Sequence, residues 1–429
     1  MNNVVVDINW QQLYTFASKQ SLLGFCFDGI ERLGKEYPKE LKRNPIEREL
    51  LMTWMGTTQH IHRQNMKVNV VASKLYSMLR EDGLRCCILK GQGNALMYPN
   101  AYSRNPGDID VWVNASRKDI TEYAKCHFKL EDDIRFHHLE TTMDGVPVEL
   151  HFFPGIMNNP VYNARLQKWF KRNADLQCSN VISLPDGIGG IAIPTTAFNV
   201  IYQLTHLYHH FFDEGIGMRQ IIDYYYVVCN FYKVYQNSSK ITPSLFTIKE
   251  GSTSHPDPLT LRGEGGNRPT RCSEPLRYKD GGASKPSPNC AGWDRLSIEG
   301  DNSAGSTTAV TSSASTALVV VQRELKYLGL WKFAGAVMYV LHEALGLSEE
   351  KMIASMDKKR GKLLLAEILN GGNFGQHFTK YGHFTHQGMA KKYFLKIWRN
   401  MHFVRYYPAE ALCEPIFRTW HFFWRLRHK

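Results

Sequence analysis

The chain has 429 residues, of which 43% are hydrophobic and 12% aromatic. A chain of this length and composition can bury the cores of roughly two to three domains, which excludes a wholly disordered protein. The formal net charge of +12 suits anionic substrates or partners. No apolar run reaches the roughly 20 residues of a membrane-spanning helix, no signal peptide is recognised, and the nine cysteines have no regular spacing. We therefore expect a cytoplasmic protein.

Residues 1–83 have the pattern of a helical region, with a break marked by Pro38 and Pro45. Residues 84–193 combine short apolar runs with helical segments and predict a mixed β-sheet core with flanking helices. Helices are expected again from residue 194 to the end, apart from one insertion. The predicted fold class is therefore α+β with a mostly helical C-terminal region.

The sheet core opens with a strand, a glycine turn and a short helix. Cys86–Leu89 is an apolar run that predicts a buried strand, in which the cysteines behave as small hydrophobic residues. A helix N-terminus after Gly91 would present N–H groups and the positive end of the helix dipole to an anion. Lys90 adds a positive charge at the same place, and Arg104 follows a little later. The segment predicts an anion cradle.

Acidic residues follow on two predicted strands. Asp108 and Asp110 lie in the strand-like segment 107–113, and side chains alternate along a strand, so both should emerge on one face. Residues 146–152 predict a second strand with Glu149 on its polar face. Two aspartates and a glutamate form an all-oxygen site of the kind that Mg²⁺ prefers when it also holds phosphates. The alternative is an Asp-x-Asp that arises by chance at a strand end and faces water.

The order of these motifs resembles the nucleotidyltransferases of the polymerase-β superfamily. The closest resemblance is to an uncharacterised bacterial nucleotidyltransferase family with a Leu-Lys-Gly opening, over about residues 65–234. The segments that carry it are Leu89-Lys90-Gly91, Tyr98-Pro99, Arg104, Gly107-Asp108-Ile109-Asp110 and Val148-Glu149-Leu150-His151. This chain departs from the wider superfamily in having Gly91-Gln92 at the turn and a longer gap before the aspartates.

The resemblance implies a role for each of these residues. Asp108 and Asp110 would bind two Mg²⁺ (or Mn²⁺) ions, and Glu149 would complete the site of the metal that activates the acceptor hydroxyl. The nucleotide phosphates would contact residues of the turn and nearby arginines: Lys90, Gly91, Gln92, Arg104 and Arg219. The reaction would move NMP from an NTP such as ATP onto a hydroxyl or phosphate, with release of pyrophosphate. The acceptor would be a small molecule, a protein or a nucleic acid.

Two other functions fit parts of this pattern. A glycosyltransferase could use the Asp-x-Asp to hold a metal and a nucleotide sugar, but it gives Glu149 no special task. A non-catalytic, nucleotide-binding regulatory protein could keep the same fold.

The helical region at residues 194–236 carries a second group of polar residues. His206 and His210 are spaced i,i+4, which would suit a metal, but we favour partly buried structural residues because no glutamate stands in the position that zinc hydrolases require. Arg219 and Asp223 have the same spacing and predict an ion pair within one helix.

Residues 237–320 are rich in Gly, Pro, Ser and Thr and predict a disordered insertion that divides the helical region. Residues 321–429 predict a helical C-terminal region that includes a loop at 371–375. Near the end of the chain, basic residues alternate with aromatic ones. We favour amphipathic helices with the aromatics packed inward, and the alternative is peripheral contact with an anionic membrane.

Overall fold

The computed structural model describes residues 8–130, 135–237, 314–377 and 389–428. The predicted insertion therefore lies almost wholly outside the described residues. Its two ends are exceptions, because Asn237 ends one helix and another helix begins at Ala314, before residue 321, where the sequence predicted the helical C-terminal region to start. The described residues all lie in the compact unit formed by residues 1–240 and 312–429.

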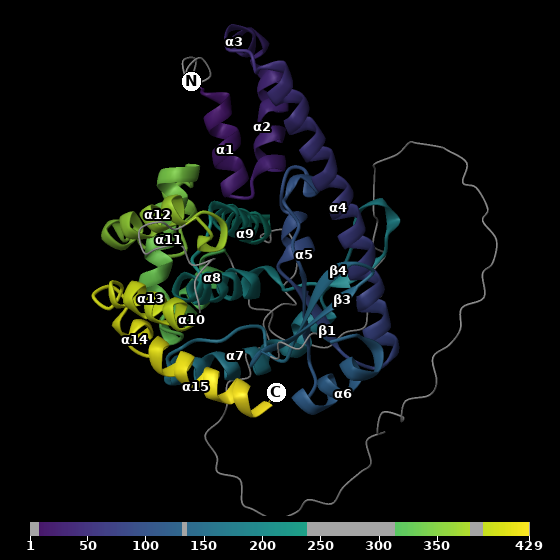
Figure 1. Ribbon diagram of the computed structural model, residues 1–429, viewed down its shortest axis with the longest axis vertical. Helices are drawn as coiled ribbons and strands as arrows, with labels where there is room; N and C mark the ends of the chain where they lie inside the picture. The colour runs from purple at the N-terminus through teal and green to yellow at the C-terminus, as the bar shows by residue number, and fades with distance from the viewer. Residues whose placement is uncertain (1–7, 131–134, 238–313, 378–388, 429) are drawn as a thin grey trace, which may run out of the picture. The chain divides into compact units, whose positions relative to one another are not determined.

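The N-terminal region is helical, as predicted. Pro38 begins a short helix between two longer ones, and the fourth helix is a single rod of 34 residues. The helices of this region are α1 (Trp10–Lys19), α2 (Leu23–Glu36), α3 (Pro38–Arg43) and α4 (Arg48–Glu81). Figure 1 shows α4 running beside the sheet.

The core contains a four-stranded mixed sheet in the order β1-β2-β4-β3. Its strands are β1 (Cys86–Leu89), β2 (Ile109–Val113), β3 (His138–Met143) and β4 (Val146–His151). β1 and β2 are antiparallel, β2 and β4 parallel, and β4 and β3 antiparallel. The other elements of this region are α5 (Gly91–Ala95), α6 (Arg117–His127), α7 (Pro160–Ser179) and the hairpin of β5 (Val181–Ser183) and β6 (Gly190–Ala192).

One face of this sheet is apolar apart from Thr141 of β3. Ile109, Val111, Val148 and Leu150 point to it and pack against α4 and α6 in a single buried cluster. The opposite face is apolar only in part, where Trp112 packs on aromatic residues of α7 and α8. The remainder of that face carries charged residues, because each strand alternates between the two faces.

Helices make up the rest of the described chain. They are α8 (Thr196–Asp213), α9 (Met218–Asn237), α10 (Ala314–Tyr327), α11 (Trp331–Leu345), α12 (Lys358–Gly371), α13 (Met389–Met401), α14 (Pro408–Ala411) and α15 (Glu414–His428). Their large buried cluster includes residues of α8, α9, α11 and α12 and extends to α1 and α2. The mixed sheet and the helical C-terminal region confirm the predicted α+β class. None of the described helices is long and apolar enough to cross a membrane.

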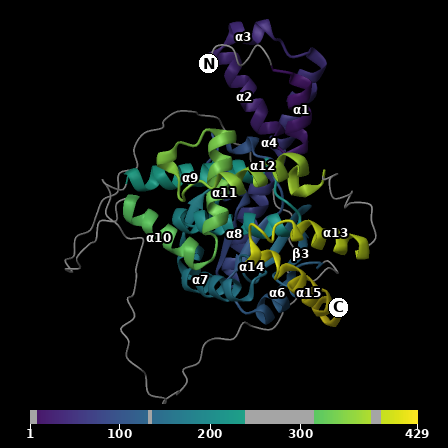
Figure 2. The same ribbon diagram turned by 90° about the vertical axis from the view of Figure 1, so that its left-hand side faces the viewer.

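The last helices differ from the favoured interpretation. Phe403 and Tyr407 are buried, as expected for inward packing. Five other aromatic residues on α13 and α15 are 45% to 68% exposed: Phe394, Trp398, Trp420, Phe422 and Phe423. Figure 2 shows these two helices, and they contact one another. Inward packing therefore accounts for only part of the aromatic pattern.

Candidate active site

Strand register brings three carboxylates side by side on the partly polar face of the sheet. Asp110 of β2 is the partner of Glu149 on β4, and Glu149 is in turn the partner of Glu140 on β3. Residues that are partners across a ladder point to the same face. His151 and His138 are partners one step further along β4 and β3. Acidic and histidine side chains thus form two adjoining rows.

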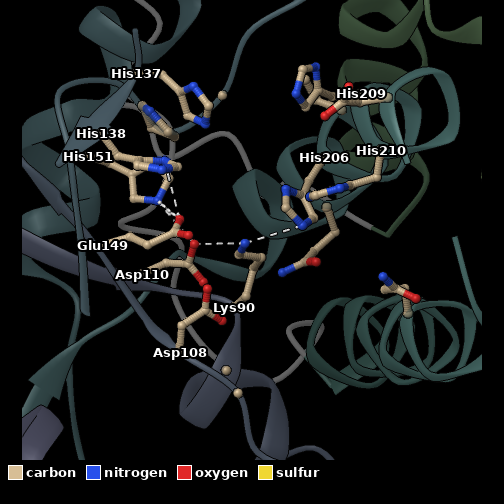
Figure 3. Close-up of a pocket in the computed structure, with 18 of the residues that line it drawn as sticks. Lys90, Asp108, Asp110, His137, His138, Glu149, His151, His206, His209 and His210 are labelled. Carbon is tan, nitrogen blue, oxygen red and sulfur yellow. Dashed lines mark hydrogen bonds and ion pairs between the residues drawn. The ribbon is translucent and has the colours of Figure 1, made fainter. Parts of the chain in front are cut away.

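The carboxylates are held by a lysine and a histidine (Figure 3). Lys90 Nζ lies 2.8 Å from Oδ1 of Asp110, a side chain that is only 3% exposed. Nε2 of His151 lies 3.0 Å from Oδ1 of Asp110 and 3.0 Å from Oε2 of Glu149. Two positive groups can therefore balance the buried negative charges. Asp108 immediately precedes β2 and is exposed at the cavity edge.

Proton affinities in this cluster follow from these contacts. The negative charge of Asp110, with burial, raises the pKa of Asp108 to about 7. Burial opposes ionisation of Asp110, but Lys90 and the hydrogen bond from His151 hold its pKa below the ordinary value. Burial also opposes ionisation of Glu149, but a hydrogen bond from His151 and the charges of His151 and Lys90 together hold its pKa below the ordinary value. Burial opposes a charged His151, yet Asp110 and Glu149 raise its pKa to about 9.

The glycine turn positions Lys90 as the sequence predicted, but it buries Gln92. Lys90 has φ 52° and Gly91 has φ 36°, so the chain turns sharply at the end of β1. This turn brings Lys90 between Asp110 and Nε2 of His206, which lies 3.2 Å from Nζ. Gly91 lines the cavity. The side chain of Gln92 is instead buried and donates to Asn69 of α4, so it does not reach the cavity.

The two candidate arginines have different environments. Arg104 is 5% exposed and bonds Asp223 with both Nε and Nη2, each at 2.8 Å. The predicted pairing of Asp223 with Arg219 is therefore wrong, since Asp223 pairs with Arg104 and accepts from the hydroxyl of Tyr98. Nη1 of Arg219 donates to the carbonyl of Asn105 at 3.0 Å. The contact of Arg219 depends on the tertiary structure, because the loop before β2 lies against α9.

A cavity of about 300 Å³ lies in front of the carboxylates. His206, His209 and His210 of α8 face the sheet across it, as Figure 3 shows. Phe374, from the predicted loop at residues 371–375, also lines it, and its ring centroid lies 5.7 Å from the Arg219 guanidinium. His206 and His210 are half-buried, as favoured from the sequence, but they belong to the cavity wall.

Several residues of this cavity were not singled out from the sequence as candidate functional residues. His137, His138 and Arg135 line its sheet side, and His151 was quoted only as part of a motif. The motif Val148–His151 did carry a signal, since His151 follows Glu149 at the same-face spacing of two. The sequence carries no such signal for His137 and His138, because β3 has no acidic motif that marks it as part of a site.

The donor set fits a divalent cation. Asp110, Glu149 and His151 each offer a ligand atom within 4.8 Å of the others. Asp108 is not in that group but is near enough for Asp110 to dominate its pKa. Carboxylates are the ligands that Mg²⁺ and Mn²⁺ take in proteins.

Comparison with known protein families also supports a nucleotidyltransferase. A family model described as "uncharacterised nucleotidyltransferase" matches residues 7–236, which is more than half of the chain. The chain belongs to this family of nucleotidyltransferases. Membership supports nucleotidyl transfer as the general reaction class.

A search of curated proteins found no match to this chain. Among solved structures, an antigenic nucleotidyltransferase-like protein from Paracoccidioides brasiliensis matches with 16% identity over 38% of this chain and 75% of that chain. The TM-score is 0.26, and at that value the likeness adds nothing to the fold assignment.

Proposed function

We propose that this member of the family is a metal-dependent nucleotidyltransferase that moves NMP from an NTP to a hydroxyl or phosphate acceptor. The observation that carries the proposal is the row formed by Asp110 and Glu149 across the β2–β4 ladder, with Asp108 beside it at the cavity edge. The oxygen of the acceptor forms a bond to the α-phosphorus, and the bond from that phosphorus to the bridging oxygen breaks. Pyrophosphate leaves, and the acceptor proton passes to solvent.

Mg²⁺ or Mn²⁺ held by Asp108, Asp110 and Glu149 would neutralise phosphate charge and lower the pKa of the acceptor hydroxyl. The protein's own cations flank this position. Lys90 forms an ion pair with Asp110. Arg219 lies close to Gly107, the residue before Asp108, because its Nη1 is 3.8 Å from the position that a β-carbon on Gly107 would take. Lys90 and Arg219 are therefore the proposed phosphate contacts, together with the backbone of Gly91.

Arg104 has a different proposed role. Its guanidinium is engaged by Asp223 through two hydrogen bonds. Both groups are buried, and breaking the pair to reach a phosphate would leave Asp223 charged and unpaired, which is costly. We assign Arg104 to positioning the loop that leads into Asp108.

The proposed reaction is tested by measuring pyrophosphate release with each of the four NTPs and with Mg²⁺ or Mn²⁺. Cell lysate is added as a source of the acceptor. The Asp108→Asn/Asp110→Asn double variant should lose metal-dependent release. Asp144→Asn is the matched control, since Asp144 lies in the β3–β4 turn and pairs with exposed Lys74 on the surface. Labelled NTP would then show which lysate fraction holds the acceptor.

Single variants separate this reaction from transfer of a sugar. Asp110→Asn and Glu149→Gln should both abolish pyrophosphate release, because both carboxylates belong to the proposed metal site. Retained activity of Glu149→Gln with a nucleotide sugar would support a glycosyltransferase instead. No release from a folded protein that binds Mg²⁺ would contradict the proposed function.

A further inference from the structure

Three histidines gather at one end of β3 and β4, beside the carboxylate row (Figure 3). His138 and His151 are ladder partners, and His137 continues the pairing through its carbonyl, which accepts from the N–H of Phe152 at 2.9 Å. The ring centroids of His137 and His138 are 4.2 Å apart, and those of His138 and His151 are 5.0 Å apart. Each of the three residues offers a ring nitrogen within 4.8 Å of the other two.

Carboxylates hold the Nε2 side of two of these rings. Nε2 of His151 contacts both Asp110 and Glu149, and Nε2 of His138 contacts Glu140 at 3.1 Å. When the ring is neutral, a carboxylate at Nε2 favours the tautomer with the proton on Nε2, which leaves a lone pair on Nδ1. This is the arrangement that orients histidine ligands of metals, in which the second ring nitrogen donates to a carboxylate.

The Nδ1 atoms lack the partners that buried polar atoms normally have. His138 and His151 are 3% and 4% exposed, and Nδ1 of each makes no hydrogen bond within the described part of the chain. Nδ1 of His138 lies 3.3 Å from Oε2 of Glu149 without hydrogen-bond geometry. Buried polar atoms without partners are uncommon and often mark a site for a water or an ion.

We propose that His137, His138 and His151 form a nitrogen-rich site for a late first-row divalent metal of the Zn²⁺ class, next to the carboxylate site and sharing Glu149 with it. Neutral imidazoles suit Zn²⁺, Co²⁺ and Ni²⁺, whereas Mg²⁺ prefers oxygen ligands. Nitrogens at about 2.1 Å from a tetrahedral Zn²⁺ lie roughly 3.4 Å apart. The three residues now offer ring nitrogens within 4.8 Å of one another, so the ligand atoms would draw closer together when the ion binds.

The surroundings are compatible with such an ion. An imidazole binds a metal in its neutral form, which burial favours. At His151 the metal has to displace a proton that Asp110 and Glu149 favour. Arg135 is a nearby cation, and its Nε lies 2.9 Å from Oε1 of Glu140. Three protein ligands leave a further coordination position for water or for a substrate group.

The test uses the full-length protein, freed of metal by dialysis against a chelator. It is then dialysed with one equivalent of Zn²⁺ in excess Mg²⁺, and bound zinc is measured by mass spectrometry. Co²⁺ in place of Zn²⁺ reports nitrogen ligation through its visible d–d bands. The wild type should retain one equivalent and show these bands. His137→Gln and His138→Gln should lose both signals.

Matched variants separate this site from its neighbours. Asp108→Asn should keep the Zn²⁺, because Asp108 belongs only to the carboxylate site. His127→Gln should also keep it, since His127 ends α6 and its ring contacts the carbonyl of Tyr123. Glu140→Gln keeps all three ligands but weakens the orientation of His138, so Zn²⁺ affinity should fall about 10- to 100-fold.

His137→Gln is the decisive variant if His138→Gln does not fold, because His137 precedes β3 and is only half-buried. Circular dichroism verifies the fold of each variant. The proposal is overturned if the wild type retains no zinc in Mg²⁺, or if His137→Gln binds Zn²⁺ as tightly as the wild type. Zinc binding without pyrophosphate release would support this site and contradict the proposed transfer reaction. Pyrophosphate release without zinc binding would support the proposed transfer reaction and contradict this site.

Discussion

Asp110 and Glu149 lie opposite each other on parallel strands, and both carboxylates contact the same atom, Nε2 of His151, at 3.0 Å. In the absence of other cations, the two carboxylates are therefore held together by His151 and by Lys90 on the other side of Asp110. The two carboxylates can therefore stay close together before a metal binds. Asp108 is outside this arrangement and can be replaced at lower structural cost.

Asp108→Asn should abolish transfer without destabilising the protein. Asp110 repels the charge of Asp108 and raises its pKa to about 7, so a neutral side chain removes a repulsion. The melting temperature of the metal-free variant should stay level or rise slightly. Because Asp108 is exposed, we expect only a small rise. A fall of several degrees would identify Asp108 as a structural residue and contradict its assignment to the metal site.

Stability of the metal-free protein should fall from about pH 6.5 to about pH 9. The pKa of His151 is raised from 6.5 to about 9 in the folded protein. Charged His151 therefore stabilises the fold fully below its unfolded pKa, and this stabilisation is lost as the pH rises through the folded value. The loss is about 1.4 kcal/mol for each pH unit of this window.

Urea unfolding at several pH values measures this effect. His151→Gln should flatten the pH dependence in that window, while His127→Gln should leave it unchanged. An identical slope in wild type and His151→Gln would show that another group causes it.

Arg104 and Arg219 should respond differently to removal of their charge. Arg104→Met leaves buried Asp223 without its main partner, so stability should fall by about 3–5 kcal/mol. Arg219→Met removes a guanidinium that donates a hydrogen bond to the carbonyl of Asn105. The stability of this variant should therefore change far less, while KM for the NTP rises.

Denaturant unfolding and steady-state kinetics of both variants test this distinction. The double variant Arg104→Met/Asp223→Asn should be more stable than Arg104→Met alone, because it removes the uncompensated charge. Equal stability losses in the two arginine variants would contradict the separate roles.

The exposed aromatic residues of α13 and α15 are expected to contact an anionic membrane surface. Trp420, Phe422 and Phe423 are at least 45% exposed, and the exposed residues Arg405 and Arg427 lie in the same C-terminal region. Aromatic and basic side chains together suit an interface with anionic lipids.

Co-sedimentation with phosphatidylserine vesicles should detect this binding, and salt should weaken it. Trp420→Ser/Phe423→Ser should reduce binding severalfold. Met52→Ser/Met55→Ser is the matched control, because these exposed apolar residues are on α4, in a different region of the chain. Equal binding to uncharged phosphatidylcholine vesicles, or none to either kind, would rule out the electrostatic part of the interface.

The sequence by itself determined the local features on which the site depends. Alternation along a strand is a property of neighbouring residues, and for that reason the polar placement of Asp110 and Glu149 and the turn at Gly91 were predictable. Tertiary structure alone decided which distant groups meet. Arg104 pairs with Asp223, 119 residues away, and His138 meets His151 only through the register of β3 and β4. Such pairings depend on how helices and strands pack into one core, which no local pattern encodes.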